Sequence, residues 1–242
     1  LPISLEPIHP SAAPSIRDID VFFPIMHGPL CEDGTLQGLL ELADVAYVGA
    51  GVLGSAIGMD KDVAKRLAAG AGVPVAPYIT VLKDVFELDQ GESTLRAREQ
   101  LKLPVFVKPC NMGSSVGIHK VKSWDDLETA IRDAFQYDVK VLVEQGVNAR
   151  EIECAALEEK KGRPFITLPC EIITSSKHEF YSYDAKYLDD DGARFEIPAQ
   201  IEKSQEIRVQ QLAADVFTAL ECAGLARIDF FLDRDTNKFY FN

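Results

Sequence analysis

The clearest chemical pattern in the chain is the run VFVKPCNMGSSVG at residues 105–117. It predicts a buried strand that ends in a lysine, then a loop of small residues and the start of a second strand. A lysine that closes an apolar strand is costly unless its ammonium leaves the sheet to meet an anion. Glycine and serine in the loop leave backbone N–H groups and hydroxyls free to approach phosphate oxygens. The run therefore favours a phosphate site around Lys108, with an ordinary solvated lysine before a hairpin as the alternative.

Strands and helices alternate on both sides of this run. Near the start of the chain, strand and helix patterns follow each other at the spacing of an α/β layer with a parallel sheet. A charged helix is expected between residues 82 and 104. We predict strands at 19–26, 46–48, 75–82, 104–108, 117–122, 140–144, 151–157, 169–173, 226–232 and 238–241, and helices at 35–42, 55–70, 124–135 and 204–223. The expected fold class is therefore α/β.

Composition excludes several classes of protein. Of the 242 residues, 47% are hydrophobic and 26% are charged, which is typical of a globular protein and not of a disordered or fibrous one. The 25 basic and 38 acidic residues give a net charge of −13, which disfavours nucleic-acid binding. No apolar run approaches the ~20 residues of a membrane span, and the five cysteines form no C-x-x-C pair. We therefore expect a soluble cytoplasmic protein from a reducing compartment, with no nucleic-acid or membrane partner.

A second glycine-rich motif, GAGVLG at residues 49–54, follows a short strand and opens a helix. The dinucleotide-binding motif G-x-G-x-x-G has this setting, but it also needs an acidic residue at the end of an internal strand further on. Asp84 lies at a tolerable distance, yet the strand before it contains Pro74 and Pro77. Prolines belong on edge strands. A tight strand-to-helix turn is therefore the favoured interpretation, with nicotinamide or flavin binding as the alternative.

Three further segments place charged residues at the end or on one face of predicted strands. An apolar strand runs into Glu144 and a flexible connection whose backbone could read a purine edge. Glu151 alternates with apolar neighbours on the next strand. Arg227 and Asp229 are two apart and share a face, and a carboxylate beside phosphates is a natural ligand for Mg²⁺. Taken singly, each is as readily a solvated acid or a surface salt bridge.

Taken together, the order of these features resembles the ATP-grasp superfamily, and within it the D-alanine–D-alanine ligase family. The resemblance runs over nearly the whole chain and is most specific at residues 27–28, 32–38, 59–61, 108–109, 113–117, 181–187 and 227–229. It implies an N-terminal parallel-sheet (pre-ATP-grasp) domain followed by a two-subdomain ATP-grasp fold. The implied boundaries are an N-terminal substrate domain at 1–58, a central subdomain at 59–143, and a C-terminal subdomain at 144–242 with a mobile loop at 175–196.

The resemblance also assigns roles to individual residues. The nucleotide-binding set that it implies is Lys61, Lys108, Ser115, Glu144, Gln145, Val147, Glu151, Phe180, Tyr181 and Lys186. In this set the lysines would contact the phosphates of ATP, the residues from 144 to 151 would contact adenine and ribose, and the aromatic residues would cover the nucleotide. The implied catalytic set is His27, Ser114, Tyr187 and Arg227. Ser114 and Tyr187 would hydrogen-bond over the first D-alanine, and Asp229 would bind Mg²⁺ or Mn²⁺.

The implied activity is ATP-dependent ligation of two D-alanines through an acyl phosphate, for peptidoglycan precursor synthesis. Two parts of the family pattern are not found: an N-terminal strand with a glycine-rich turn, and a C-terminal metal-binding glutamate and asparagine. We therefore expect either a fragment of such a ligase or a protein that cannot complete its own metal site; a homodimer is one assembly that the resemblance allows. The alternatives are D-lactate as acceptor, which the Ala185–Lys186–Tyr187 segment disfavours, a non-catalytic nucleotide-binding protein, and the nicotinamide-dependent oxidoreductase.

Overall fold

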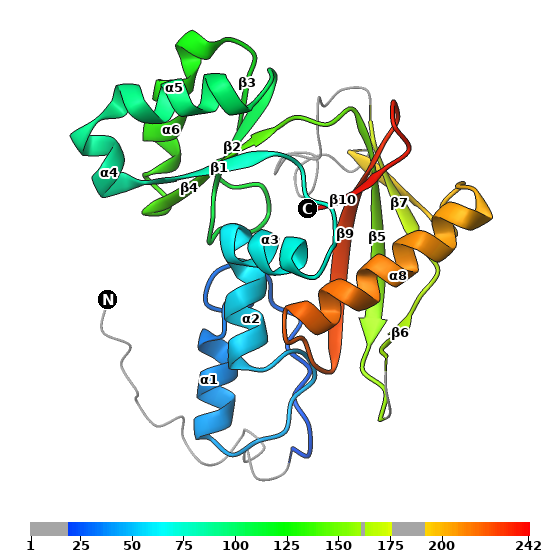
Figure 1. Cartoon of the computed structure of the whole chain (residues 1–242). Helices are drawn as coiled ribbons and strands as arrows, with labels where there is room; N and C mark the ends of the chain where they lie inside the picture. The colour runs from blue at the N-terminus through cyan, green and yellow to red at the C-terminus, as the bar shows by residue number, and fades with distance from the viewer. Residues whose placement is uncertain (1–18, 161–162, 176–191) are drawn as a thin grey trace.

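Two antiparallel sheets form the framework of the molecule (Figure 1). The structure is a computed structural model that describes residues 19–160, 163–175 and 192–242. The first sheet has the order β1-β4-β2-β3, and the second has the order β10-β9-β5-β7-β8 with β6 beside β5. The strands are β1 (Tyr78–Leu82), β2 (Val105–Pro109), β3 (His119–Val121), β4 (Lys140–Gln145), β5 (Ala149–Leu157), β6 (Phe165–Ile166), β7 (Cys170–Thr174), β8 (Ala193–Glu196), β9 (Leu225–Asp233) and β10 (Phe239–Phe241). The fold is therefore mixed α/β, as predicted.

Helices cover one face of each sheet and form most of the region before β1. They are α1 (Thr35–Leu42), α2 (Val52–Met59), α3 (Lys61–Gly70), α4 (Lys83–Leu88), α5 (Gln90–Gln100), α6 (Leu127–Ala134) and α8 (Lys203–Ala219). The helix predicted at 55–70 is in fact two helices, because the carboxylate of Asp60 caps α3 by accepting from the backbone N–H groups of Asp62 and Val63. The single charged helix expected before residue 104 is likewise two, α4 and α5.

The first region contains much less sheet than the sequence predicts. Its two expected strands, at 19–26 and 46–48, are reduced to one parallel bridge between Phe22 and Tyr47. The prediction that residues 19–26 form a buried strand is wrong, because Phe23 and Ile25 are 60% and 73% exposed. An apolar run can be buried only when neighbouring elements cover it. Within the described residues, this run pairs only with the segment around Tyr47.

Alternation along β2 and β4 separates a core face of the first sheet from a polar face. Val105 and Val107 are fully buried and pack with the helices, including Phe86 of α4 and Ile131 of α6. Because successive side chains point to opposite faces of a strand, Lys108, which follows Val107, points away from this core. On β4, Glu144 likewise follows the core residue Val143. The first sheet thus presents charged groups on the side opposite its helices.

The second sheet is built around the pairing of β5 with β9, which extends from Ala149 opposite Asp233 to Leu157 opposite Leu225. Its core face packs against α8 and includes Ile152, Ile228 and Phe230. The alternate residues of β9, Arg227 and Asp229, therefore lie on the other face. Helix α3, placed by the sequence in the 59–143 subdomain, packs Ala64 and Ala68 into this second core. The subdomain boundaries themselves stay predictions.

The GAGVLG motif has a packing explanation. Gly51 precedes α2 as its N-cap, and Gly54 lies against the loop after α8. A Cβ at Gly54 would come within 2.5 Å of the carbonyl oxygen of Glu221, a distance that real Cβ atoms do not reach. A glycine at this position therefore allows α2 to approach the backbone of another segment, and the motif needs no bound dinucleotide to account for it.

Two glycines of α2 provide a matched test of this explanation. Gly54→Ala is expected to destabilise the protein by about 1–3 kcal/mol, because the new methyl group overlaps the Glu221 carbonyl. Gly58→Ala meets nothing within 4 Å and should stabilise the protein by up to about 1 kcal/mol, because alanine favours the helix. Urea unfolding of both variants would measure the difference. Similar effects for the two substitutions would contradict the packing explanation.

Candidate active site

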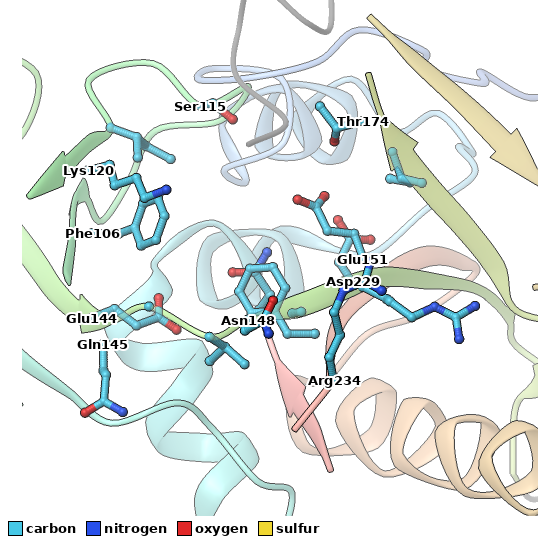
Figure 2. Close-up of a pocket in the computed structure, with 18 of the residues that line it drawn as sticks. Phe106, Ser115, Lys120, Glu144, Gln145, Asn148, Glu151, Thr174, Asp229 and Arg234 are labelled. Carbon is cyan, nitrogen blue, oxygen red and sulfur yellow. The ribbon is translucent and has the colours of Figure 1, made fainter. Parts of the chain in front are cut away.

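A cavity of about 710 Å³ is lined by both sheets and by the connection between them (Figure 2). Phe106 and Lys120 lie on one side, while Glu151 and Asp229 lie together on the other. The lining residues are Pro104, Phe106, Lys108, Ser115, Ile118, Lys120, residues 144–151, residues 171–174, Arg227, Asp229, Phe231, Arg234, Asp235 and Asn242. Eight predicted site residues are among them: Lys108, Ser115, Glu144, Gln145, Val147, Glu151, Arg227 and Asp229. The fold therefore brings residues more than 100 positions apart into one cavity.

At one end of the cavity, a buried carboxylate lies between two lysines. The Glu144 side chain receives the Lys108 ammonium on Oε2 at 2.7 Å and the Lys65 ammonium on Oε1 at 2.9 Å. Burial opposes ionisation of Glu144, but the charges of Lys108 and Lys65 outweigh it and hold the pKa of this carboxyl at about 2. The group of three carries a net charge of +1, which favours an anion at this end of the cavity.

This arrangement predicts a specific acid sensitivity. The folded pKa of Glu144, about 2, is below its ordinary value of 4.5, so its stabilising contribution is present above pH 4.5 and is lost as the pH falls towards 2. In that window the free energy of unfolding should lose up to about 1.4 kcal/mol per pH unit through this group. The double variant Lys65→Met/Glu144→Gln removes the carboxyl together with its more deeply buried counterion, and leaves Lys108, which lines the cavity.

Urea unfolding between pH 2.5 and 6 would measure the slopes. The free energy of unfolding of the double variant should depend less steeply on pH than that of the wild type. Between pH 2 and 4.5 the slope should be smaller by up to about 1.4 kcal/mol per pH unit, which corresponds to one proton. Glu99→Gln, at an exposed carboxylate on α5, serves as the control and should keep the wild-type slope. Equal slopes for the wild type and the double variant would show that Glu144 is not the linked group.

Lys61 lies behind the small-residue loop and outside the cavity lining. Its ammonium donates to the carbonyl oxygen of Met112 and, at 3.5 Å, to that of Cys110. Burial, followed by the charge of nearby Lys108, lowers the pKa of Lys61 to about 8. The structure thus joins Lys61 to the backbone of the predicted phosphate loop, and its contact with phosphate stays a prediction.

The small-residue loop adopts a backbone that L-residues rarely use. Ser114 and Ser115 have φ angles of 54° and 60°, in the left-handed region, and only Ser115 of the two lines the cavity. Such conformations in non-glycine residues cluster at functional sites. At Gly113 the loop meets the turn that carries His27, because a Cβ there would be 3.4 Å from the Cα of Gly28. His27 is exposed, and its Nδ1 lies 3.7 Å from Oε1 of Glu32.

Backbone hydrogen bonds fix the last residue of β4 and the first residue of its connection to β5. The backbone N–H of Gln145 donates to Pro77 at 2.9 Å, and that of Gly146 donates to Pro104 at 2.8 Å. The side-chain oxygen of Gln145 also accepts from the N–H of Lys102 at 3.0 Å. These bonds position the following segment, from Val147 to Glu151, along the cavity wall. The contact of this segment with purine and ribose stays a prediction.

At the other end of the cavity, one guanidinium lies between two carboxylates. Arg227 forms a bidentate pair with Asp229, with both N···O distances at 2.9 Å, and its Nε lies 3.2 Å from Oε2 of Glu153. Glu153 and Asp229 are register partners on β5 and β9. The Asp229 carboxylate, together with Glu153, raises the pKa of Arg227, and this outweighs the opposing effect of partial desolvation. The net charge here is −1, opposite in sign to that around Glu144.

Four predicted site residues lie outside the described part of the chain, and two residues at the site were not predicted. Phe180, Tyr181, Lys186 and Tyr187 lie outside the described residues, as does most of the loop predicted at 175–196. Lys65 and Asn242 were missed as site residues, although Asn242 accepts from the Lys108 ammonium at 3.3 Å. The sequence signal for Lys65 is its position between Ala64 and Ala68 on the buried face of α3. A lysine on such a face requires a buried partner.

Comparison with protein families identifies the chain. The family model described as "D-ala D-ala ligase C-terminus" matches residues 67–242, and the model described as "D-ala D-ala ligase N-terminus" matches residues 5–50. This chain belongs to the D-alanine–D-alanine ligase family. All the residues that line the cavity lie within the region that the C-terminal family model covers.

Relatives and solved structures agree with the family. D-alanine–D-alanine ligase A of Bradyrhizobium diazoefficiens is 63% identical over 238 residues, which are 98% of this chain and 63% of the relative. The D-alanine–D-alanine ligase of Caldicellulosiruptor bescii is 50% identical over 93% of this chain and 60% of the relative. The crystal structure of VanG D-Ala:D-Ser ligase from Enterococcus faecalis matches with a TM-score of 0.80 and 36% identity, over 93% of this chain and 62% of that chain.

The chain thus spans about three fifths of the length of the ligases that it matches. The structure of the D-alanine–D-alanine ligase from Coxiella burnetii gives the same proportion, with a TM-score of 0.75, 34% identity and coverage of 92% of this chain and 57% of that chain. Among the described residues, none of the helices combines the length and apolarity that crossing a membrane requires.

Proposed function

We propose that this protein belongs to an ATP-dependent ligase that joins two D-alanines into D-alanyl-D-alanine for peptidoglycan synthesis. The observation that carries the proposal is the cavity, which combines a cationic end at Lys108 with an Arg227–Asp229 end in a chain of this family. Its volume of about 710 Å³ suits a nucleotide-sized ligand. Phosphate and carboxylate are both anions, so their reaction requires cationic groups such as Lys108 and Arg227 to offset their charge.

ATP would lie along the cavity with its phosphates towards Lys108 and the loop at Ser115. Lys108 is the lysine of the buried group whose side chain reaches the lining, and it lies 5.7 Å from the ring centroid of Phe231. The purine and ribose would meet the Gln145–Glu151 segment. We assign Phe180, Tyr181 and Lys186 to the nucleotide on the family resemblance alone. Lys61 would support the loop from behind.

Asp229 is the residue that would bind a magnesium ion accompanying the phosphates. The described residues contain no cluster of three His, Cys, Asp or Glu side chains that could hold a metal by themselves. Mg²⁺, however, commonly takes only one or two carboxylates and completes its shell with phosphate oxygens and water. Asp229 lines the cavity and could supply such a ligand, as it could for Mn²⁺. When bound, the ion would offset charge on the phosphate oxygens.

The remaining residues would act on the substrates. The carboxylate of the first D-alanine would attack the γ-phosphorus of ATP, which forms an acyl phosphate and releases ADP. The neutral amine of the second D-alanine would then attack the carbonyl carbon, release inorganic phosphate and lose a proton to solvent. Arg227 would donate hydrogen bonds to the oxygen that gains charge in this second step. His27, Ser114 and Tyr187 would hold the first D-alanine. We also infer a cytoplasmic location, which the five free thiols support.

Product analysis tests the proposal. The protein with MgATP and D-alanine should release ADP and phosphate, and mass spectrometry should find D-alanyl-D-alanine. ADP release that does not depend on D-alanine would contradict ligase activity, and an NADH titration by fluorescence would test the nicotinamide alternative. Because one matching structure is titled a D-Ala:D-Ser ligase, D-serine and D-lactate should be offered as competing acceptors. Preference for either over D-alanine would overturn the proposed product.

A further inference from the structure

Lys65 is a fully buried lysine beside the cavity, and the proposed reaction does not use it. Only 2% of its side chain is exposed, and it does not line the cavity. Its ammonium donates to Oε1 of Glu144 and to the carbonyl oxygen of Phe241, both at 2.9 Å. A buried lysine without partners would be strongly destabilising. Here both acceptors are supplied by strands, β4 and β10, which belong to different sheets.

The two lysines at Glu144 are not equivalent. Lys108 lines the cavity, so it can meet a ligand, whereas Lys65 is closed off from it. Each binds a different oxygen of the same carboxylate. If Lys108 turns its charge towards a phosphate, Glu144 keeps one ammonium at 2.9 Å. Without Lys65, the same movement would leave a buried carboxylate with no counterion, which costs several kcal/mol.

Lys65 also connects this carboxylate to the end of β10. Phe241, whose carbonyl accepts from Lys65, precedes Asn242, whose side-chain oxygen accepts from Lys108 at 3.3 Å. The backbone N–H of Asn242 in turn donates to the carbonyl of Asp229 at 3.0 Å. The buried ammonium therefore joins Glu144 to the end of β10, next to the residue that contacts both Lys108 and Asp229.

We propose that Lys65 is a positioning residue, the permanent counterion of Glu144 that leaves the charge of Lys108 available to the phosphates of a bound nucleotide. The inference rests on the proposed nucleotide site. It predicts different effects on the affinity for the phosphates and on the affinity for the nucleoside. Loss of Lys65 should retain Lys108 at Glu144 and so weaken phosphate binding, while the contacts of adenine and ribose are affected much less.

The test compares ADP with adenosine by isothermal titration calorimetry on the full chain. The quantity of interest is the ratio of the adenosine Kd to the ADP Kd, which reports what the phosphates contribute. In Lys65→Met this ratio should fall at least about tenfold, the effect of losing a charge-assisted hydrogen bond. In Lys65→Met/Glu144→Gln it should return to about the wild-type value, because no carboxylate then competes for Lys108.

Lys140→Met is the matched control. Lys140, on β4, is like Lys65 a largely buried lysine, but it pairs with Asp60 and does not line the cavity. Its removal should leave the ratio unchanged. Unfolding of each variant is followed by circular dichroism. Should Lys65→Met not fold, the double variant decides: a ratio at or above that of the wild type supports the inference, and a tenfold lower ratio overturns it.

The other outcomes are also decisive. An unchanged ratio in Lys65→Met overturns the inference. A double variant that keeps the low ratio of Lys65→Met also overturns it, because the effect of Lys65 would then come from its packing and not from its pairing with Glu144. Failure of the ligase function is read separately, from D-alanine-dependent release of ADP by the wild type. A wild type that binds ADP in the expected way but forms no dipeptide would leave the role of Lys65 intact.

Discussion

Arg227→Met is expected to lower kcat/KM for dipeptide formation by about 10²–10³-fold, the usual effect of removing a donor to a developing oxyanion. The KM for ATP should change little, because the phosphate end of the cavity is formed by Lys108 and its partners and not by Arg227. Steady-state kinetics with ATP and D-alanine varied in turn would measure both quantities.

Arg227→Lys sharpens this prediction. Lysine keeps the positive charge between Glu153 and Asp229 but loses the two-pronged geometry that pairs with Asp229. Its activity should lie between those of the wild type and Arg227→Met. Thermal unfolding is needed beside the kinetics, because carboxylates directly opposite each other across β5 and β9 repel once their shared cation is absent.

Arg234→Met provides the control for charge alone. Arg234 is an exposed arginine that lines the same cavity, and no role in the reaction is proposed for it. Its replacement should leave kcat largely unchanged. If Arg234→Met reduces the rate as strongly as Arg227→Met, general electrostatics and not a specific donor at Arg227 would explain the result.

Alternation and capping made the two main sheets predictable from sequence. On β9 the apolar residues Ile228 and Phe230 alternate with Arg227 and Asp229, and this pattern alone indicates which side chains share a face. Ser123 caps the turn before α6 by accepting from Asp125, as its residue type predicts. The run at 19–26 has an equally apolar pattern but fails, because burial depends on covering elements that no local pattern reports.

Lys65 shows why part of the site could not be predicted. Its partner Glu144 lies 79 residues away, and the other acceptor is a backbone carbonyl 176 residues away. The apolar face of α3 indicates that Lys65 needs a buried partner, but no local pattern shows which residues supply it. The cavity lysine Lys108 was found because its own strand and loop carry the signal. The sequence therefore identifies groups that face a ligand more readily than the groups that hold them in place.

Lys108→Met is expected to raise the KM for ATP about tenfold to a hundredfold, since a hydrogen bond to a charged group contributes about 1.5–3 kcal/mol. Methionine keeps an unbranched stem beside the rings of Phe106 and Phe231, so the change is mainly one of charge. The fold should tolerate it, because Glu144 keeps the Lys65 ammonium at 2.9 Å. Lys102→Met, at an exposed lysine outside the cavity lining, should leave the KM for ATP unchanged. A KM for ATP in Lys108→Met equal to that of the wild type would remove Lys108 from the nucleotide site, and with it the reason for a buried counterion at Lys65.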